Sequence, residues 1–442
     1  MNNIISGPSG PVEGTIFLPS SKSISNRLLM IHSLGQSGAS MENLSESDDT
    51  RVMKQAMVSS GTVKDVGHAG TAMRFLTAYY SVIPGKVVLT GSERMKQRPI
   101  GPLVEAFREL GARISYMEEE GYPPVEILGG GLEGGEVEID GGISSQFISA
   151  LMMVGPVLRQ GLHITLKGNP VSPTYLRMTA GLMKICGVPV SMDDRSIKVP
   201  QMLYRMDDFQ VESDWSAASY WFQVAALVPG SVIRLPRLRK ESLQGDSVLV
   251  SLFELLGVSA RFDGEGLEIS SVRRDDRSTS APREDRSSSG SLDDRSSTDP
   301  VRANPPYTYD FTGCPDLVQT MAVTLCAMGL PFRFTGTRTL RIKETDRIAA
   351  LQSELNKLGF HLQSDYDGDT LSWDGEKHRP VNHPVIGTYH DHRMAMAFAP
   401  ASAVFGPLSI EDPGVVSKSY PGFWEDLRKA GFTVNSKDHD GG

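Results

Sequence analysis

The sequence predicts an α/β protein of two similar domains, and three observations lead to this fold class. The chain has 442 residues, which exceeds the length at which a single hydrophobic core stops growing. Its composition, 39% hydrophobic and 22% charged residues, is that of a globular protein. One α/β pattern also recurs six times along the chain, which predicts two domains of three units each.

The repeated unit is an amphipathic helix, a glycine that can end the helix in the left-handed conformation, and a β-rich run. The six units cover residues 50–65, 103–116, 176–192, 247–262, 347–363 and 423–434. Their glycines are Gly61, Gly111, Gly187, Gly257, Gly359 and Gly431, which follow one another at intervals of 50, 76, 70, 102 and 72 residues. Because three of the five intervals lie between 70 and 76, the pattern indicates an internal repeat with one short and one long exception.

Each exceptional interval has a local explanation. The long one contains residues 273–300, which are almost entirely Arg, Asp, Glu, Ser, Thr and Pro. This segment has too little apolar surface to offset the entropy cost of ordering, so it is predicted to be a disordered insert. A tolerated surface insertion is a simpler explanation for it than a regulatory tail. The short interval predicts that one unit lacks a piece, such as a strand pair, between Gly61 and Gly70.

Charge and cysteine content argue against several classes of protein. The net charge of -9 disfavours binding to nucleic acids or to anionic membranes, although a cleft can still gather cations for an anionic substrate. Three cysteines are too few for a disulfide framework. The chain start lacks the pattern of a secretory signal, and no apolar run is long enough to span a membrane. These features favour a cytoplasmic protein.

Two polar motifs lie at predicted helix starts. Residues 19–27 (Pro-Ser-Ser-Lys-Ser-Ile-Ser-Asn-Arg) bring hydroxyls together with Lys22 and Arg27, and cations beside helix N-terminal amides make an anion site. Residues 68–74 form a small-residue turn in which Gly70 would let the backbone approach a ligand closely. The simpler interpretations are a capped helix with a solvated lysine and an ordinary tight turn.

Three further segments add cations and hydroxyls. Residues 94–99 (Arg-Met-Lys-Gln-Arg-Pro) form a basic loop, and residues 143–147 (Ile-Ser-Ser-Gln-Phe) begin an apolar helix with three polar side chains. Those side chains suit a phosphate or a sugar-like hydroxyl. In residues 341–347 (Arg-Ile-Lys-Glu-Thr-Asp-Arg), a helix would present Lys343 and Arg347 on one face. The alternative for this last segment is a salt-bridged surface helix.

The last motif, residues 389–393 (Tyr-His-Asp-His-Arg), precedes a strongly apolar run. Arg393 is therefore predicted to stand at the start of a buried helix. A His-x-His metal site is the weaker interpretation, because no further ligand lies at a recognisable metal-binding spacing.

Taken together and in this order, the motifs resemble those of the shikimate-pathway enolpyruvyl transferases. The runs Lys-Glu-Thr-Asp-Arg at 343–347 and Asp-His-Arg-Met-Ala at 391–395 are highly specific, and Ser-Lys-Ser at 21–23 and Ser-Ser-Gln at 144–146 add to them. The likeness extends over nearly the whole chain outside the insert. It implies two domains, each of three βαβαββ-like repeats around buried helices. Residues 1–20 plus 213–442 would form the C-terminal-type domain, and residues 21–212 the N-terminal-type domain.

The resemblance implies that the enolpyruvyl group of phosphoenolpyruvate is transferred to the 5-hydroxyl of shikimate 3-phosphate, with release of phosphate and with no metal or organic cofactor. Asp316 matches the base near the attacking hydroxyl, Glu344 matches the group that protonates the methylene carbon, and Lys22 would touch both substrates. The shikimate 3-phosphate site would comprise Lys22, Ser23, Arg27, Ser144, Ser145, Gln146, Ser172, Asp316, Thr339 and Lys343. The phosphoenolpyruvate site would comprise Lys22, Gly70, Arg98, Gln146, Arg347, Arg393 and Lys418. We expect a monomer without nucleic-acid or membrane partners.

Some positions depart from the family pattern: Ser20 replaces a Gly, His68, Thr339 and His390 each replace an Asn, Phe75 replaces a Pro, and Pro173 replaces a Lys. None of these departures removes a charged catalytic group, so they affect the expected geometry of ligand binding. Two alternatives stay open. The sister transferase for UDP-N-acetylglucosamine usually carries a reactive Cys or Asp near the basic loop, and none of the three cysteines lies near Arg98. A degenerate, non-catalytic relative is favoured only by the shortened first repeat.

Overall fold

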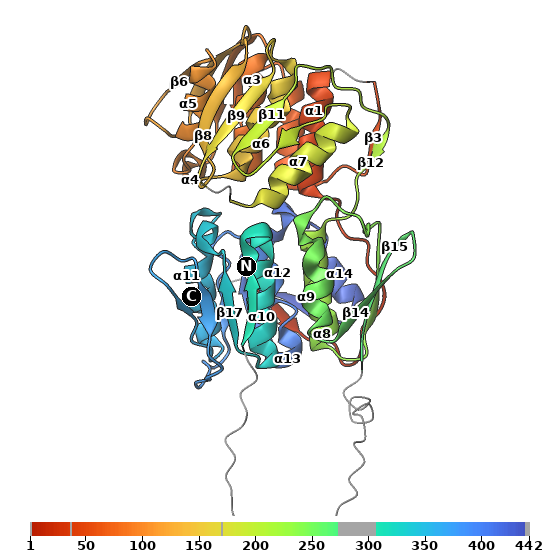
Figure 1. Ribbon diagram of the computed structural model, residues 1–442. Coiled ribbons are helices and arrows are strands. Elements are labelled where there is room, and N and C mark those ends of the chain that lie inside the picture. The colour runs from red at the N-terminus through yellow and green to blue at the C-terminus, as the bar shows by residue number, and fades with distance from the viewer. Residues whose placement is uncertain (1, 36–37, 169–170, 273–305, 438–442) are drawn as a thin grey trace, which may run out of the picture.

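The computed structural model describes residues 2–35, 38–168, 171–272 and 306–437. The insert predicted to be disordered, residues 273–300, lies outside the described residues. The chain forms two lobes, stacked in Figure 1, and each has its own hydrophobic core. One core draws on residues 24–211, the other on residues 5–18 and 215–434. The chain passes between the lobes beside a bridge that pairs Ser20 with Ser213. From these cores we propose that residues 21–212 form one domain and residues 1–20 with 213–442 form the other.

The N-terminal lobe contains two complete units. Each runs strand, buried helix, strand, outer helix and a strand pair. The first of them comprises β4 (Val63–Asp65), α3 (Gly70–Val82), β5 (Gly85–Thr90), α5 (Gly101–Glu109), β6 (Arg113–Tyr116) and β7 (Val125–Gly129), with a short α4 (Glu93–Lys96) before α5. The second comprises β8 (Gly135–Asp140), α6 (Ser145–Val154), β9 (Leu162–Lys167), α7 (Pro173–Ile185), β10 (Ser191–Met192) and β11 (Ser196–Val199).

The C-terminal lobe contains three units of the same kind. The first comprises β2 (Glu13–Thr15), α8 (Trp215–Leu227), β13 (Val232–Pro236), α9 (Leu249–Glu254), β14 (Val258–Phe262) and β15 (Gly266–Ser271). The second comprises β16 (Tyr307–Asp310), α10 (Val318–Met328), β17 (Phe332–Thr335), α11 (Arg347–Lys357), β18 (Gln363–Ser364) and β19 (Leu371–Trp373). The third comprises β20 (Val385–Ile386), α12 (His392–Phe398), α13 (Ser402–Phe405), β21 (Leu408–Glu411), α14 (Phe423–Lys429), β22 (Thr433–Lys437) and the chain's first strand, β1 (Asn2–Ser6).

Among the described residues, five four-stranded sheets share one topology. In each, the first two strands are parallel and the remaining pairings are antiparallel, as in β4-β5-β7-β6. In the last sheet β1 lies between β21 and β22, with Asn3 opposite both Ile410 and Ser436. The N-terminal strand therefore completes the final unit and ties the two ends of the described chain together.

The remaining unit is shorter than the others. It comprises α1 (Lys22–Gly35), β3 (Met41–Glu42), α2 (Asp48–Val58) and β12 (Phe209–Gln210), and its sheet has only the parallel pair β12-β3 in the described chain. After α2 the chain enters β4 of the next unit at Val63, without an intervening strand pair. This agrees with the strand pair predicted to be missing between Gly61 and Gly70.

The repeat glycines distinguish this unit as well. Gly111, Gly187, Gly257, Gly359 and Gly431 have φ between 83° and 94°, so five of the six predicted left-handed helix ends are confirmed. The prediction is wrong for Gly61, which lacks a positive φ. Helix α2 ends at Val58, and Ser59 is already extended. Because no strand pair follows, the chain has no reversal to make at this position.

Among the described residues, no helix combines the length and apolar character needed to cross a membrane.

Candidate active site

The N-terminal ends of the buried helices of both lobes surround a cleft between the lobes. Residues at or next to the N-termini of α1, α3, α6, α8, α10 and α12 line it, namely Lys22, Gly70, Ser145, Ser216, Asp316 and His392. A helix N-terminus carries unpaired amides and partial positive charge. Because helices from both lobes point their N-termini into one space, the fold itself favours an anionic ligand there.

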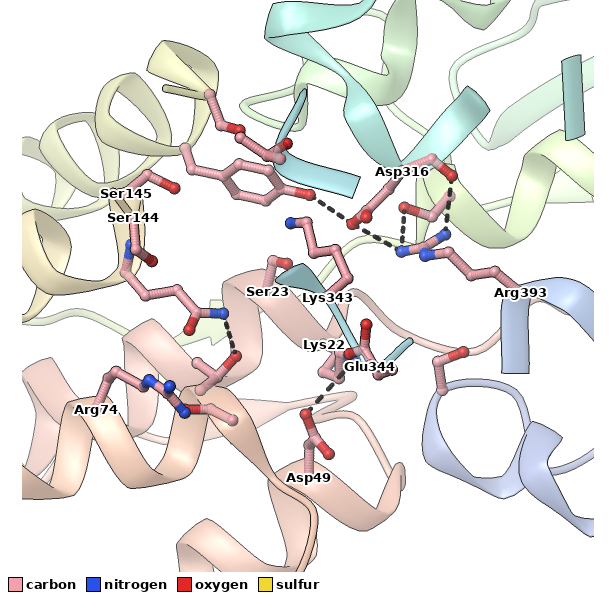
Figure 2. Close-up of a pocket in the computed structure, with 18 of the residues that line it drawn as sticks. Lys22, Ser23, Asp49, Arg74, Ser144, Ser145, Asp316, Lys343, Glu344 and Arg393 are labelled. Carbon is pink, nitrogen blue, oxygen red and sulfur yellow. Dashed lines mark hydrogen bonds and ion pairs between the residues drawn. The ribbon is translucent and has the colours of Figure 1, made fainter. Parts of the chain in front are cut away.

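Sixteen residues predicted for the site come together in this region. Fifteen of them line the cleft: Lys22, Ser23, Arg27, Gly70, Arg98, Ser144, Ser145, Gln146, Ser172, Asp316, Thr339, Lys343, Glu344, Arg347 and Arg393. The other, Lys418, is not a lining residue, but its Nζ lies 3.3 Å from an oxygen of Glu344. Figure 2 shows Ser144 and Ser145 of the N-terminal lobe facing Asp316 and Arg393 of the C-terminal lobe.

Arg27, on the N-terminal wall, has only neutral partners. Its guanidinium is buried and donates to the hydroxyls of Thr179 (2.7 Å) and Ser149 (3.3 Å) and to the carbonyl of Ser23 (3.0 Å). Burial lowers the pKa of Arg27 to about 10, because desolvation disfavours the charged form. The side chain is still a cation at neutral pH, and its charge is left for an anionic ligand.

Gly70 and Arg98 form a second feature of this wall. A Cβ placed on Gly70 would lie 2.5 Å from an Nη atom of Arg98, closer than any ordinary contact. The missing side chain therefore makes room for the Arg98 guanidinium itself, which refines the expectation that Gly70 lets backbone approach a ligand. Arg74 lies beneath them and donates to the carbonyls of Gly70 (3.3 Å) and Pro99 (3.0 Å).

Arg347 organises the C-terminal wall. The side chain is almost fully buried, and its three nitrogens contact three carboxylates: Asp391 at 2.7 Å, Asp316 at 2.9 Å and Glu344 at 2.9 Å. Burial would lower the pKa of Arg347, but the charges of Asp391, Glu344 and Asp316 raise it overall. The guanidinium thus holds both predicted acid–base carboxylates in one network.

The helical interpretation of residues 341–347 is wrong. A 3-10 turn ends at Ile342, Lys343 is extended, and α11 begins only at Arg347. The cause is Asp346, whose carboxylate accepts from the amides of Ile348 (3.1 Å) and Ala349 (3.0 Å) and so caps the helix. Lys343 and Arg347 still reach the cleft together, but from a loop and a helix start.

Asp316 is held by both lobes. Arg393 lies 2.8 Å from one of its oxygens, and the hydroxyl of Tyr175 donates to that same oxygen at 2.9 Å. Burial would raise the pKa of Asp316, but Arg393, Lys343 and Arg347 hold it well below its usual value. The carboxylate is therefore ionised at neutral pH.

Glu344 is held in the same way by cations. Burial would raise its pKa, but Lys418, Arg347 and Arg98 keep it well below the usual value. Burial also lowers the pKa of Lys343, and Asp316 opposes this. Removing cationic charge from around Glu344 would let burial dominate and raise its pKa, which makes it a group whose protonation can respond to an anionic ligand.

The two histidines of the last motif lie in different environments. His392 is buried, and burial together with Lys22 and Arg393 lowers its pKa well below the usual value. His390 is exposed, with Nδ1 at 3.4 Å from Asp412. Within the described part of the chain, no group of three or more His, Cys, Asp or Glu residues is arranged to hold a metal ion.

Several lining residues were not identified from the sequence, among them Asp49, Thr71, Tyr175, Asp214, Ser216, Tyr220, His392 and Ser419. Asp49 lies 3.6 Å from Lys22 (Figure 2). In sequence it is one of two acids in the first turn of α2, which is an ordinary feature of helix starts. Tyr175 offered a weak signal, because it lies three residues after the predicted Ser172.

Comparison with known proteins identifies the family of the chain. The family model described as EPSP synthase (3-phosphoshikimate 1-carboxyvinyltransferase) matches residues 7–62 and 54–427. The chain is 47% identical to a 3-phosphoshikimate 1-carboxyvinyltransferase of Bacteroides fragilis, covering 98% of this chain and 99% of the relative. It is 36% identical to the protein of that name from Sulfurovum sp., covering 97% and 99%.

Solved structures confirm the predicted fold. An EPSP synthase from Acinetobacter baumannii superimposes with a TM-score of 0.72 at 21% identity, covering 99% of this chain and 100% of that structure. The predicted fold class is therefore confirmed: the repeats predicted two α/β domains, and the family resemblance implied that they are of the enolpyruvyl transferase type. The sequence, the fold and the family model all agree, and the chain belongs to the EPSP synthase (3-phosphoshikimate 1-carboxyvinyltransferase) family.

Proposed function

We propose that the cleft is the active site at which this chain transfers the enolpyruvyl group of phosphoenolpyruvate to the 5-hydroxyl of shikimate 3-phosphate. Phosphate is released, and the product serves aromatic amino acid biosynthesis. The observation that carries this assignment is the Arg347 network. It holds two largely buried carboxylates, Asp316 and Glu344, in a cleft that also presents several cations and hydroxyls.

The N-terminal wall suits shikimate 3-phosphate. Ser144, Ser145 and Ser172 lie at the starts of α6 and α7, where hydroxyls and amides can hold a phosphate. Arg27 brings a cation whose partners are all neutral. Thr339, on the C-terminal lobe, has a buried hydroxyl without a partner in the described structure, which suits a ligand hydroxyl.

The C-terminal wall suits phosphoenolpyruvate and the proton transfers. Arg347, Arg393 and Lys418, with Arg98 from the opposite wall, would bind its carboxylate and phosphate. Each well-made charge-assisted bond contributes roughly 1.5–3 kcal/mol. As these cations turn toward the ligand, their hold on Glu344 weakens and its pKa rises, so that Glu344 can carry the proton that the methylene carbon receives.

The reaction then runs in two stages. In the first stage Asp316 takes the proton of the 5-hydroxyl, and the oxygen of that hydroxyl bonds to C2 of phosphoenolpyruvate. Glu344 protonates C3, which becomes a methyl group. In the second stage the C2–O bond to phosphate breaks, Asp316 gives its proton to the departing phosphate, and Glu344 removes a methyl proton to restore the double bond. Asp316 and Glu344 thus exchange acid and base roles between addition and elimination, and Lys22 stands beside both substrates. Closure of the lobes would orient the substrates and exclude water.

We also propose that the protein acts as a monomer in the cytoplasm. The cleft is lined by residues of both lobes of one chain, so it is complete without a second copy. Cys186, Cys314 and Cys326 are free and buried, which suits a reducing compartment.

Phosphate release from phosphoenolpyruvate tests the assignment. The protein is incubated with phosphoenolpyruvate and either shikimate 3-phosphate or UDP-N-acetylglucosamine, and free phosphate is measured with time. We expect release only with shikimate 3-phosphate. Release with the nucleotide sugar instead would identify the sister activity, and no release with either acceptor would identify a non-catalytic relative.

A further inference from the structure

The connection between β20 and α12 enters the active site through a strained turn. Tyr389 and His390 are successive residues with φ of 55° and 57°. A left-handed backbone is unfavourable for residues with side chains, and it persists where surrounding contacts over-determine it. The next residue is Asp391, which accepts from Arg347 at 2.7 Å and from the amide of Arg393 at 2.9 Å. The turn therefore leads directly into a residue that contacts two arginines of the proposed phosphoenolpyruvate site.

A buried carboxylate that has no part in the proposed reaction holds this turn. Glu354 lies on α11, seven residues after Arg347, and its side chain is 0% exposed. One oxygen accepts from the hydroxyl of Tyr389 at 2.6 Å. The other accepts from the amide of Gly387 at 3.0 Å. Glu354 thus binds the connection at two points: the backbone amide of Gly387, before the turn, and the side chain of Tyr389, the first residue of the turn.

Lys357, one turn further along α11, extends this attachment. Its Nζ donates to Glu354 at 2.7 Å and to the carbonyl of Val385 at 2.8 Å. The fit around Gly387 is close, because a Cβ there would lie 3.3 Å from Glu354 and 3.3 Å from the ring of Tyr389. Helix α11 therefore contacts β20 at residue 385 and the following connection at residues 387 and 389.

The presence of a charged residue at position 354 needs an explanation other than stability, because a buried ion pair is weak evidence for a stabilising role. A well-packed apolar residue is often as good or better at such a position. A carboxylate that accepts from two directed donors, however, specifies one arrangement of the chain that carries them. Here the chain so fixed runs directly into Asp391, which contacts Arg347 at the start of α11, and then into Arg393.

We propose that Glu354, acting through Tyr389, is a positioning residue for phosphoenolpyruvate binding. It fixes the start of α12 against the start of α11, and so sets the spacing between the guanidinium groups of Arg347 and Arg393 without touching substrate. This inference rests on the proposed function and deepens it. Most residues of the proposed shikimate 3-phosphate site lie on the N-terminal wall. Loosening the attachment of the turn to α11 should therefore affect the binding of the two substrates unequally.

Steady-state kinetics of Glu354→Gln and Tyr389→Phe test the proposal. Both changes keep the side-chain shape and weaken the contact between them. We expect the KM for phosphoenolpyruvate to rise about tenfold, because each variant loses one or two directed hydrogen bonds. The KM for shikimate 3-phosphate should stay within about twofold of the parent value. Ser353→Ala is the matched control, because it removes the other partner of the Tyr389 hydroxyl, at 3.2 Å, and should leave both constants unchanged.

Amide hydrogen exchange supplies a readout that needs no substrate. Residues 385–393 should exchange faster in Glu354→Gln and Tyr389→Phe than in the parent, while α10 should not change. Equal rises in both KM values, or faster exchange with an unchanged KM for phosphoenolpyruvate, would show that Glu354 is merely structural and overturn the proposal. Unchanged exchange would overturn it too. A parent protein that turns over neither substrate would defeat the proposed function, and the exchange result would still decide whether Glu354 positions the turn.

Discussion

The two walls of the cleft hold their charges in opposite ways. On the N-terminal wall, Arg27, Arg74 and Arg98 form no ion pair within the described chain, and the first two donate to hydroxyls, carbonyls and a thioether. On the C-terminal wall, Arg347 and Arg393 each contact a carboxylate, and Lys418, which does not line the cleft, contacts Glu344. Lys22 alone among the N-terminal cations of the cleft has an acidic partner, Asp49, at 3.6 Å.

This difference separates binding from chemistry. Cations with neutral partners keep their charge for a ligand, so the N-terminal wall is a ready anion site at the cost of desolvating guanidinium groups. Cations paired with carboxylates have no net charge to offer, but they keep the carboxylates ionised and respond when a ligand competes for them. The N-terminal wall is thus suited to holding a phosphate, and the C-terminal wall to coupling ligand binding to proton transfer.

The largest expected effect comes from neutralising the carboxylates of the C-terminal wall. Asp316→Asn and Glu344→Gln should each retain the fold and reduce kcat by about 10²–10⁴-fold, the usual size of a general acid–base contribution. Asp367→Asn is the matched control, because Asp367 pairs with Arg338 at 2.9 Å on the exposed surface of the same lobe. Turnover near that of the parent in either active-site variant, with substrate binding intact, would remove that residue from the mechanism.

A smaller effect should follow from crowding the N-terminal wall. Gly70→Ala places a methyl group against the Arg98 guanidinium, which must move, so the KM for phosphoenolpyruvate should rise about tenfold. If the effect of Gly70→Ala depends on Arg98, then Arg98→Lys and the double variant Gly70→Ala/Arg98→Lys should have nearly equal KM values for phosphoenolpyruvate. The added methyl group then no longer displaces a guanidinium group. Strictly additive effects of the two changes would show that Gly70 acts independently of Arg98.

The smallest effect concerns stability and pH, and it contrasts the walls directly. The pKa of Glu344 is held below its usual 4.5 in the folded protein, so its stabilising contribution is complete above that value and is lost as pH falls through the folded pKa. The gap in Tm between the parent and Glu344→Gln should therefore narrow from pH 7 toward pH 3.

Arg27→Met provides the comparison for that experiment. The hydrogen-bond partners of Arg27 are two hydroxyls and a carbonyl, which do not titrate in this range, so its Tm gap should stay constant between pH 7 and pH 3. Thermal melts of the three proteins across that range make the measurement. Parallel curves for all three would mean that the carboxylate network of the C-terminal wall is not coupled to folding.

The sequence predicted the repeat, its shortened unit and most of the site because each has a local signature. A glycine that ends a helix is visible in the residues around it, and five of six adopt the left-handed conformation. The missing strand pair is visible as a spacing between Gly61 and Gly111. Many of the site residues belong to short motifs, several of them at helix starts, where neighbouring residues specify chemistry and backbone geometry. Asp316, Thr339 and Lys418 were inferred only from the family resemblance.

Tertiary structure alone decided which of these groups meet. Tyr175 reaches Asp316 across 141 positions of sequence, and Asp48 reaches Ser417 across 369, at 2.6 Å. No periodicity encodes such pairs, because they depend on how the two lobes pack. Packing inside one lobe has a similar effect on Arg347, whose helical partner in the sequence pattern was Lys343, but whose actual partners are three carboxylates on different elements of the C-terminal lobe. Local sequence set the helix starts, and packing within and between the lobes set which charged groups meet.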